Sequence, residues 1–322
     1  MDKIVLKHTD LNVSRICLGA MTFGSQTDEA SATRMIDRCT ESGINFLDTA
    51  NVYNQGASEE MLGRVLGTRR RSFVLASKVR NKMGEAPDLA GLSRPAILRA
   101  IDDSLRRLRT DYLDLYYLHL PDYSVPIEES LDAMNEVVKQ GKVRYLASSN
   151  YSAWQMTEMF WIAERKGYQA PWVAQPMYNL IARGIEQEYL PMSKHFGVSN
   201  IVYNPLAGGL LTGKHQREAP IPGTRFDKNK MYMDRYWHPA DFDAVDQLSK
   251  VAGQAGRSLL SMSLNWLYHH TAADCIILGA SKAEHLEQNL AALRDGPLAA
   301  ETVQACDRVW TDLRGPTPKY NR

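Results

Sequence analysis

The chain has 322 residues, of which 44% are hydrophobic, 9% aromatic and 23% charged. This balance is typical of folded globular proteins and excludes a disordered or collagen-like chain. Lysine and arginine number 38 against 37 aspartates and glutamates, so the formal charge is +1 and no overall field favours nucleic acid or an anionic membrane as a partner.

The start of the chain and its cysteines bear on the cellular compartment. The first ten residues carry charges where a secretory signal peptide has an apolar stretch, and no apolar run reaches the ~18 residues of a membrane-spanning helix. We therefore expect a cytoplasmic location without a membrane anchor. The cysteines form no C-x-x-C pair, which argues against a disulfide framework or a metal site. We interpret them as buried free thiols: Cys17, Cys39, Cys275 and Cys306.

In chain order, the first element expected is a β-hairpin within residues 1–14, where a turn separates two short apolar segments. Eight short apolar runs follow, and each is predicted to be a strand. The runs span residues 16–18, 45–48, 73–77, 113–119, 143–148, 172–176, 200–203 and 275–278. The segments between them have helical periodicity; in residues 95–108, Ile97, Ile101 and Leu105 fall on one face. At similar spacing, Trp154, Met156 and Trp161 are interpreted as packing residues.

Strands that alternate with helices of about 10 to 15 residues predict parallel βαβ units, and eight such units favour an α/β fold of the (β/α)8 TIM barrel type. The alternative is an open doubly wound sheet, which is weakly supported because residues 19–24 lack the middle glycine of G-x-G-x-x-G. We expect one domain over residues 1–322, with the hairpin at the barrel bottom. Residues 205–240 are expected to form a long cofactor and substrate loop at the C-terminal face, and residues 297–322 a C-terminal helix and tail.

Polar residues that end apolar runs are candidates for catalysis, because the active site of a (β/α)8 barrel lies at the carboxyl ends of its strands. Asp48, Lys78 and His119 occupy such positions, and Tyr53 follows Asp48 by five residues. A lysine ammonium next to a phenol stabilises the phenolate, which is expected to lower the pKa of Tyr53 and make it a usable proton donor. Taken singly, each residue also has an ordinary structural explanation, such as a turn cap or a solvent-facing charge.

Two long motifs resemble those of the aldo-keto reductases. The first is GINFLDTANVY at residues 43–53 with SEEMLG at 58–63, and the second is GKVRYLASSN at 141–150. YNPLAGGLLTGK at residues 203–214 and DRYW at 234–237 are similar to the aflatoxin aldehyde reductase and succinic semialdehyde reductase group. The resemblance implies NADPH-dependent reduction of aldehydes to alcohols. It assigns the catalytic roles to Asp48, Tyr53, Lys78 and His119.

The resemblance also implies which residues bind NADPH, from the nicotinamide ring to the adenine. They are Met21, Ser149, Asn150, Gln175, Tyr203, Asn204, Leu206, Gly208, Leu211, Lys214, Arg225, Gly279, Ser281, Lys282, His285, Gln288 and Asn289. Polar groups at Ser149, Asn150 and Gln175 suit a carboxamide, and the ring of Tyr203 suits stacking. Ser281 and Lys282 suit a phosphate at a helix N-terminus.

The substrate implied is a small carbonyl compound. Arg235 and Arg322 match the pair that meets a substrate carboxylate in relatives that reduce succinic semialdehyde, so carboxylated aldehydes are expected alongside dicarbonyls. The alternative is that Arg235 pairs with Asp234 or Asp241.

Two other functions stay open from the sequence. One is an NAD(P)-linked sugar or alcohol dehydrogenase, because the same four residues work in both directions. The other is a non-catalytic nucleotide-sensing subunit like the potassium-channel β subunits. The resembling group contains homodimers, and a homodimer is expected here.

Overall fold

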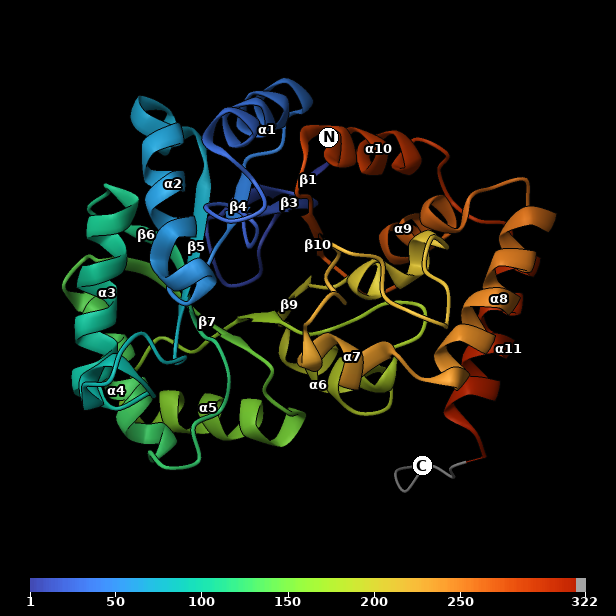
Figure 1. Cartoon of the computed structure of the whole chain (residues 1–322). Coiled ribbons are helices and arrows are strands. Elements are labelled where there is room, and N and C mark those ends of the chain that lie inside the picture. The colour runs from blue at the N-terminus through green and yellow to red at the C-terminus, as the bar shows by residue number, and fades with distance from the viewer. Residues whose placement is uncertain (317–322) are drawn as a thin grey trace.

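A computed structural model describes residues 1–316 of the chain, in which eight parallel strands close into a barrel (Figure 1). Around the barrel the strands follow the order β10-β3-β4-β5-β6-β7-β8-β9. Their bounds are β3 Ile16–Gly19, β4 Phe46–Asp48, β5 Val74–Val79, β6 Leu113–Leu118, β7 Val143–Ser149, β8 Val173–Gln175, β9 Ser199–Val202 and β10 Cys275–Gly279. Each overlaps one of the eight predicted runs, and the (β/α)8 barrel is confirmed.

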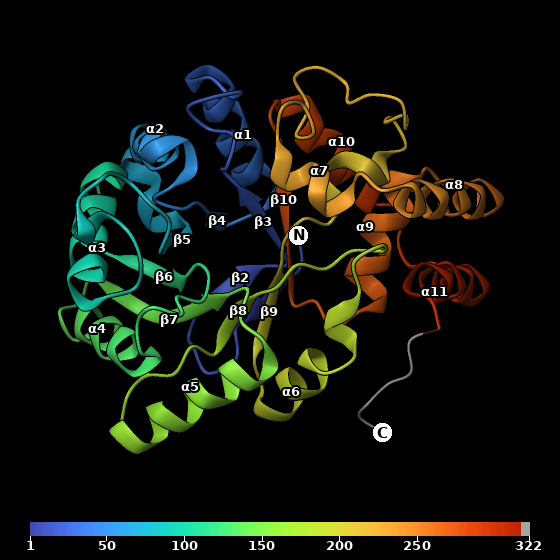
Figure 2. The same ribbon diagram turned by 60° about the horizontal axis from the view of Figure 1, so that its bottom comes forward.

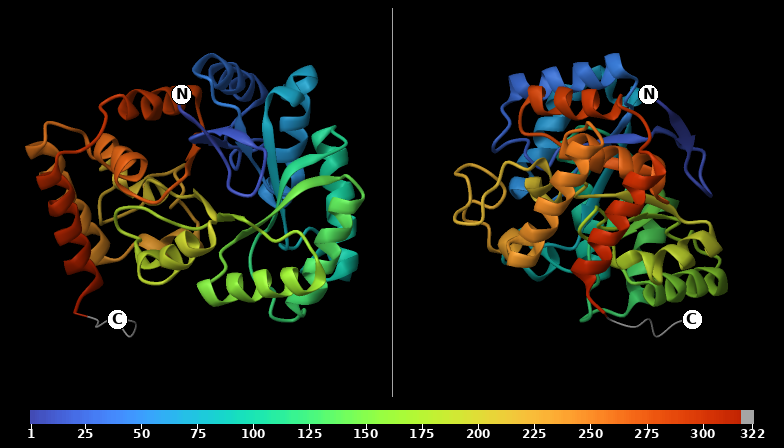
Figure 3. Two further views of the ribbon diagram at one scale, coloured as in Figure 1. Left: turned by 180° about the vertical axis from the view of Figure 1, so that it is seen from behind. Right: turned by 90° about the vertical axis from the view of Figure 1, so that its right-hand side faces the viewer.

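Helices surround the barrel and complete the βα units (Figures 1 and 2). They are α1 Glu29–Ser42, α2 Ala57–Leu66, α3 Arg94–Leu108, α4 Ile127–Lys139, α5 Ala153–Lys166, α6 Tyr189–Phe196, α7 Lys230–Tyr236, α8 Pro239–Gln254, α9 Leu259–His270, α10 Ala283–Leu293 and α11 Ala300–Arg314. Helices α8 and α11 lie against each other outside the barrel wall (Figure 3).

Helix α3 shows how the sequence pattern becomes a packed element. It begins one residue before the predicted start, with a proline in its first turn, where the missing N–H costs nothing. The residues predicted to share one face, Ile97, Ile101 and Leu105, are buried. The helix ends at Leu108, and the cap residue Arg109, with a φ of 53°, takes the chain out of the helical path.

A hairpin closes the N-terminal end of the barrel, as predicted. Its strands are β1 Lys3–Val5 and β2 Asn12–Ser14, which pair antiparallel. Leu6, Leu11 and Val13 are at most 2% exposed and pack in one cluster with inward-facing residues of the barrel strands. The opposite end, where the strands finish, is therefore the end left for chemistry.

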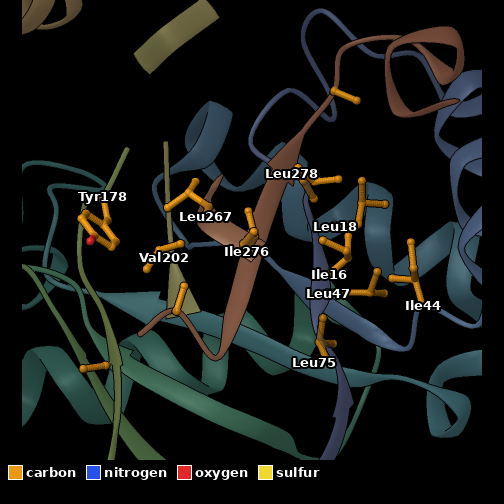
Figure 4. Packing of buried hydrophobic residues seen from close by; sticks show 14 of the residues in the cluster. Ile16, Leu18, Ile44, Leu47, Leu75, Tyr178, Val202, Leu267, Ile276 and Leu278 are labelled. Atoms are coloured by element: carbon orange, nitrogen blue, oxygen red, sulfur yellow. The ribbon is translucent and has the colours of Figure 1, made fainter. Parts of the chain in front are cut away.

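Alternation along the strands decides which side chains reach the barrel interior. Ile16, Leu18, Leu47 and Leu75 pack outward, in the cluster shared with the helices (Figure 4). Because neighbouring residues of a strand point to opposite faces, the residue after Leu47, Asp48, points inward at the carboxyl end of β4.

The segment 205–240, expected to be one long loop, is partly helical. It contains the 3₁₀ turn Ala207–Thr212 and helix α7, and helix α8 already begins at Pro239. The side chain of Asn229 caps α7 by accepting a hydrogen bond from the Tyr232 N–H. The segment was expected to be a loop because α7 has only seven residues, too few for a helical period to stand out.

The packing role expected for Trp154 and Trp161 is wrong. Both lie on the outer face of α5, with 61% and 66% of their surface exposed, whereas Met156 is fully buried. Two residues along a helix correspond to a rotation of about 200°, so Met156 faces the core when Trp154 faces away from it.

The structure also bears on the cysteines and on membrane insertion. Cys17, Cys39, Cys275 and Cys306 are buried free thiols, as expected. Among residues 1–316, no helix is long and apolar enough to cross a bilayer.

Helical glycines provide a test of the packing between α2 and α3. A Cβ at Gly63 would lie 2.5 Å from the backbone oxygen of Arg107, which cannot move without shifting α3. We expect Gly63→Ala to lower the free energy of unfolding by about 1 to 3 kcal/mol through this overlap. In α8, Gly253 has open space around it, so Gly253→Ala is expected to gain up to about 1 kcal/mol from helix propensity. Urea unfolding followed by circular dichroism measures both, and equal effects of the two variants would contradict this account.

Candidate active site

The centre of the site is a buried ion pair between the ends of adjacent strands. Lys78 on β5 is fully buried and Asp48 on β4 is 3% exposed. The ammonium donates hydrogen bonds to the Asp48 carboxylate and, at 2.7 Å, to the Thr49 backbone oxygen. Gln175, at the end of β8, donates to the other Asp48 oxygen at 2.8 Å. Burial by itself would lower the pKa of Lys78, but the Asp48 carboxylate raises it, and the net rise keeps the ammonium charged.

Tyr53 reaches this pair from a tight turn between β4 and α2. Asn54 and Gln55 both have positive φ, 53° and 55°, in the left-handed region that non-glycine residues rarely adopt. The Asn54 amide stabilises the turn by donating to the backbone oxygens of Met21 and Phe23 at 3.0 and 2.7 Å. The Lys78 ammonium lies 5.1 Å from the centre of the Tyr53 ring.

The direction of the Tyr53 pKa differs from the one expected from the sequence. Burial raises the pKa of the phenol, and the Lys78 charge lowers it without cancelling that effect, so the net pKa is raised. The expectation from the sequence took into account the Lys78 charge but not the burial of the Tyr53 hydroxyl. Tyr53 is therefore protonated at neutral pH and available as a proton donor.

His119 follows β6 and faces Tyr53 edge to face, with ring centres 6.0 Å apart. Its backbone N–H donates to the Val79 oxygen at 3.0 Å, and its backbone oxygen accepts from the Asn150 amide at 2.9 Å. Burial, followed by the charges of Lys78 and Arg80, lowers the pKa of His119 from 6.5 to about 3. The imidazole is thus neutral at physiological pH and carries a single N–H.

Four of the residues expected at the nicotinamide end form one hydrogen-bonded group at the ends of β7, β8 and β9. The Ser149 hydroxyl donates to the Gln175 backbone oxygen at 2.8 Å, and Tyr203 donates to the side-chain oxygen of Asn150 at 2.7 Å. Because Gln175 also donates to the Asp48 carboxylate, this group is connected to the ion pair.

The residues expected along the pyrophosphate lie in the segment after β9. Asn204 accepts a hydrogen bond from the Gly208 N–H at 2.8 Å, and Gly208 has a φ of +71°. Leu206 is half-buried, Leu211 is buried and Lys214 is exposed. A guanidinium reaches the end of β10 from this segment, since a Cβ built at Gly279 would lie 2.9 Å from Nη2 of Arg225.

The residues expected at the adenosine end lie at the start of α10. Lys282 is the N-terminal cap residue, and no side-chain cap bonds this helix end in the described part of the chain, which leaves its first N–H groups available. The Ser281 hydroxyl lies 3.3 Å from Nδ1 of His285. Gln288 is exposed, whereas Asn289 is buried.

Arg235 lies on α7 without an ion-pair partner among residues 1–316, and Asp234 instead bonds Lys230 at 2.6 to 2.7 Å. Burial raises the pKa of Tyr203 to about 12, and the nearby Arg235 charge opposes that rise, so the guanidinium acts on the site. Arg322 lies outside the described residues.

One buried carboxylate of the site was not predicted. Glu59, on α2, accepts hydrogen bonds from Ser77 at 2.5 Å and from Arg107 at 2.7 Å, and it is fully buried. These bonds join the helix that follows the Tyr53 turn to the residue next to Lys78. Glu59 belongs to the SEEMLG motif, but the sequence alone does not distinguish a buried glutamate that joins two elements from an exposed one.

Two comparisons, one with protein-family models and one with known proteins, show what this chain is similar to. A family model described as "Aldo/keto reductase family" matches residues 15–311. Aldo-keto reductase family 7 member A3 of Homo sapiens is 38% identical over 95% of this chain and 96% of its own length. Aflatoxin B1 aldehyde reductase member 2 of Rattus norvegicus is 36% identical over 95% and 87%. A probable voltage-gated potassium channel subunit beta of Oryza sativa subsp. japonica is 35% identical over 94% of each chain.

The lowered pKa of His119 predicts how stability depends on pH. Between pH 6.5 and about 3, an unfolded histidine binds a proton that the native ring does not, so stability falls as pH is lowered through this window. His119→Gln removes the titrating group, so the dependence of the free energy of unfolding on pH is expected to decrease by up to ~1.4 kcal/mol per pH unit. Urea unfolding at several pH values in this window measures how steeply the free energy of unfolding changes with pH. The same measurement above pH 6.5 gives the stability that the variant loses through poorer packing alone. Equal slopes in both proteins would refute the assignment.

Proposed function

The chain belongs to the aldo/keto reductase family, and from that premise we propose that it reduces aldehydes to alcohols with NADPH, with Tyr53 as the general acid. Membership makes it an oxidoreductase, as its similarity to aflatoxin aldehyde reductases also indicates. The observation that carries the proposal is the buried Lys78–Asp48 pair beside Tyr53, with His119 across the same rim.

Each of the four side chains has one chemical task in this proposal. Tyr53 donates its hydroxyl proton to the carbonyl oxygen, and the Lys78 ammonium stabilises the phenolate as it forms. Asp48 keeps that ammonium charged and in place. His119, neutral at working pH, donates its N–H to the same carbonyl oxygen while negative charge develops there. Bound NADPH supplies the hydride.

The described residues fit a dinucleotide that carries an extra phosphate. Among the described residues no side chain caps the start of α10, and the Lys282 side chain begins at the same point. Arg225 and Lys214 add two cations from the segment after β9, and Arg225 lies beside Gly279 at the end of β10. Ser149, Asn150 and Gln175 would hold the nicotinamide carboxamide, beside the Tyr203 ring.

The role of Tyr53 is tested by Tyr53→Phe, which removes only the hydroxyl. We expect single-turnover oxidation of NADPH by an aldehyde to fall by at least ~100-fold, with NADPH affinity unchanged. Tyr123→Phe, at a side chain 85% exposed, is the matched control and is expected to behave as wild type. A Tyr53→Phe variant that keeps more than a tenth of the wild-type rate would exclude the role.

The cofactor preference follows from the cations and the helix start. Fluorescence titration is expected to show at least ~10-fold tighter binding of NADPH than of NADH, the effect of one charge-assisted contact. Lys282→Met should reduce that ratio, whereas Lys250→Met on α8 should leave it unchanged. Equal dissociation constants for the two cofactors in the wild type would overturn the preference.

Arg235 has no ion-pair partner among the residues that the structure describes, which supports carboxylated aldehydes as the substrate class. A guanidinium near the barrel mouth recognises a carboxylate through charge-assisted hydrogen bonds. We expect succinic semialdehyde to have a higher kcat/KM than butanal, by ~10-fold or more, and expect Arg235→Ala to abolish the difference. Arg308→Ala on α11 is the control. If the difference is missing in the wild type, or survives in Arg235→Ala, the substrate class is another one.

The likeness to a potassium channel β subunit supports one alternative, a subunit that binds the nucleotide without turnover. A steady-state screen of NADPH and NADH against aldehydes, dicarbonyls and sugars separates the two. Tight NADPH binding with no oxidation by any carbonyl compound would favour the subunit. Efficient oxidation of sugars or alcohols with NAD⁺ or NADP⁺ would favour a dehydrogenase.

A further inference from the structure

The end of strand β5 holds both the backbone and the ring of His119. The Val79 oxygen accepts the His119 backbone N–H at 3.0 Å, and the Asn81 side-chain nitrogen lies 3.2 Å from the ring Nδ1. We propose that Asn81 is a positioning residue that donates to Nδ1 and so keeps the ring proton on Nε2, where it faces the substrate. The inference rests on the proposed function in one respect, namely that a carbonyl oxygen accepts from His119.

The tautomer matters because His119 is neutral. A neutral imidazole has one nitrogen that donates and one that accepts, so the partner of Nδ1 decides what Nε2 offers. With an amide N–H donating to Nδ1, Nε2 carries the proton and stabilises a developing oxyanion. With an acceptor beside Nδ1, Nε2 would present a lone pair, which repels the carbonyl oxygen.

A strained residue brings Asn81 to the ring. Arg80, between Val79 and Asn81, has a φ of +147°, a sparsely populated region for a residue with a side chain. Such strain persists where the surroundings enforce it, and it is concentrated at functional sites. Here the Arg80 backbone oxygen accepts a hydrogen bond from the Gly91 N–H at 2.7 Å, which fixes the turn.

The surroundings of the amide favour the same orientation. Asn81 lines a small pocket together with Arg80, whose buried Nε has no hydrogen-bond partner among the described residues. The atom of the Asn81 amide that lies toward the imidazole is its nitrogen, which can donate a hydrogen bond to Nδ1. The two carboxylates on the cavity wall, Asp88 and Asp103, both pair with Arg99, so neither competes for the amide protons.

The ring nitrogens report the tautomer directly. Protein labelled with ¹⁵N-histidine is compared by NMR at about pH 7 as wild type, Asn81→Asp and Asn81→Leu, with His119 assigned by the signal lost in His119→Gln. We expect a protonated Nε2 in the wild type. In Asn81→Asp the carboxylate accepts a hydrogen bond, so the proton is expected to move to Nδ1. A wild-type ring protonated on Nδ1, or an Asn81→Asp ring still protonated on Nε2, overturns the proposal.

Kinetics test whether the tautomer matters for turnover. Asn81→Asp is expected to lower kcat by ~100-fold, the cost of one lost oxyanion donor, with KM for NADPH unchanged. Asn81→Leu, which removes the hydrogen bond without adding an acceptor, is expected to lose less. Equal kcat values for the Asp and Leu variants would contradict the proposal. If the Asn81→Asp variant does not fold, the wild-type NMR spectrum still shows which ring nitrogen of His119 carries the proton.

These measurements separate the inference from the proposed function. The NMR result needs no turnover, so a wild type that fails to reduce any aldehyde refutes the function and leaves the tautomer measurable. A wild type that reduces aldehydes with its ring protonated on Nδ1 refutes the inference alone.

Discussion

The ion pair between Lys78 and Asp48 is the interaction on which the rest of the site depends. Two opposite charges lie in the barrel interior, where leaving water costs several kcal/mol per ion, and their attraction offsets this only if further hydrogen bonds complete the pair. The Thr49 backbone oxygen and the Gln175 amide supply those bonds. Well-packed apolar residues at these two positions would give the fold about the same stability. The pair is therefore better explained by the effect of the Lys78 charge on Tyr53 than by a contribution to stability.

The fold supports the pair from two directions. The hairpin fills the N-terminal end of the barrel, and strand alternation points Asp48 and Lys78 into the interior at the other end. Outside the wall, Glu59 bonds both Ser77 and Arg107, so the helix carrying the Tyr53 turn is attached to the strand carrying Lys78. The geometry of the candidate site therefore depends on contacts on both the inner and the outer face of strand β5.

The barrel was predictable because its strands are short apolar runs separated by helical segments. Three of the four candidate catalytic residues were proposed because they stand at the ends of such runs, and Tyr53 because it follows Asp48 by five residues. Other features depend on three-dimensional surroundings. The net pKa of Tyr53 depends on burial. Trp154 and Trp161 have helical spacing that fits either face of α5. Asn81 lies next to His119 after a residue, Arg80, whose unusual backbone angle is not predictable from the sequence pattern.

We infer that the buried pair between Lys78 and Asp48 serves chemistry rather than stability. The most direct measurement replaces both charges at once, as Asp48→Asn with Lys78→Met, and determines urea unfolding and single-turnover aldehyde reduction on the same protein. We expect a free energy of unfolding equal to or above that of the wild type, with the rate lowered by at least ~100-fold. A double variant that keeps the wild-type rate, or that loses stability and rate together, would contradict it.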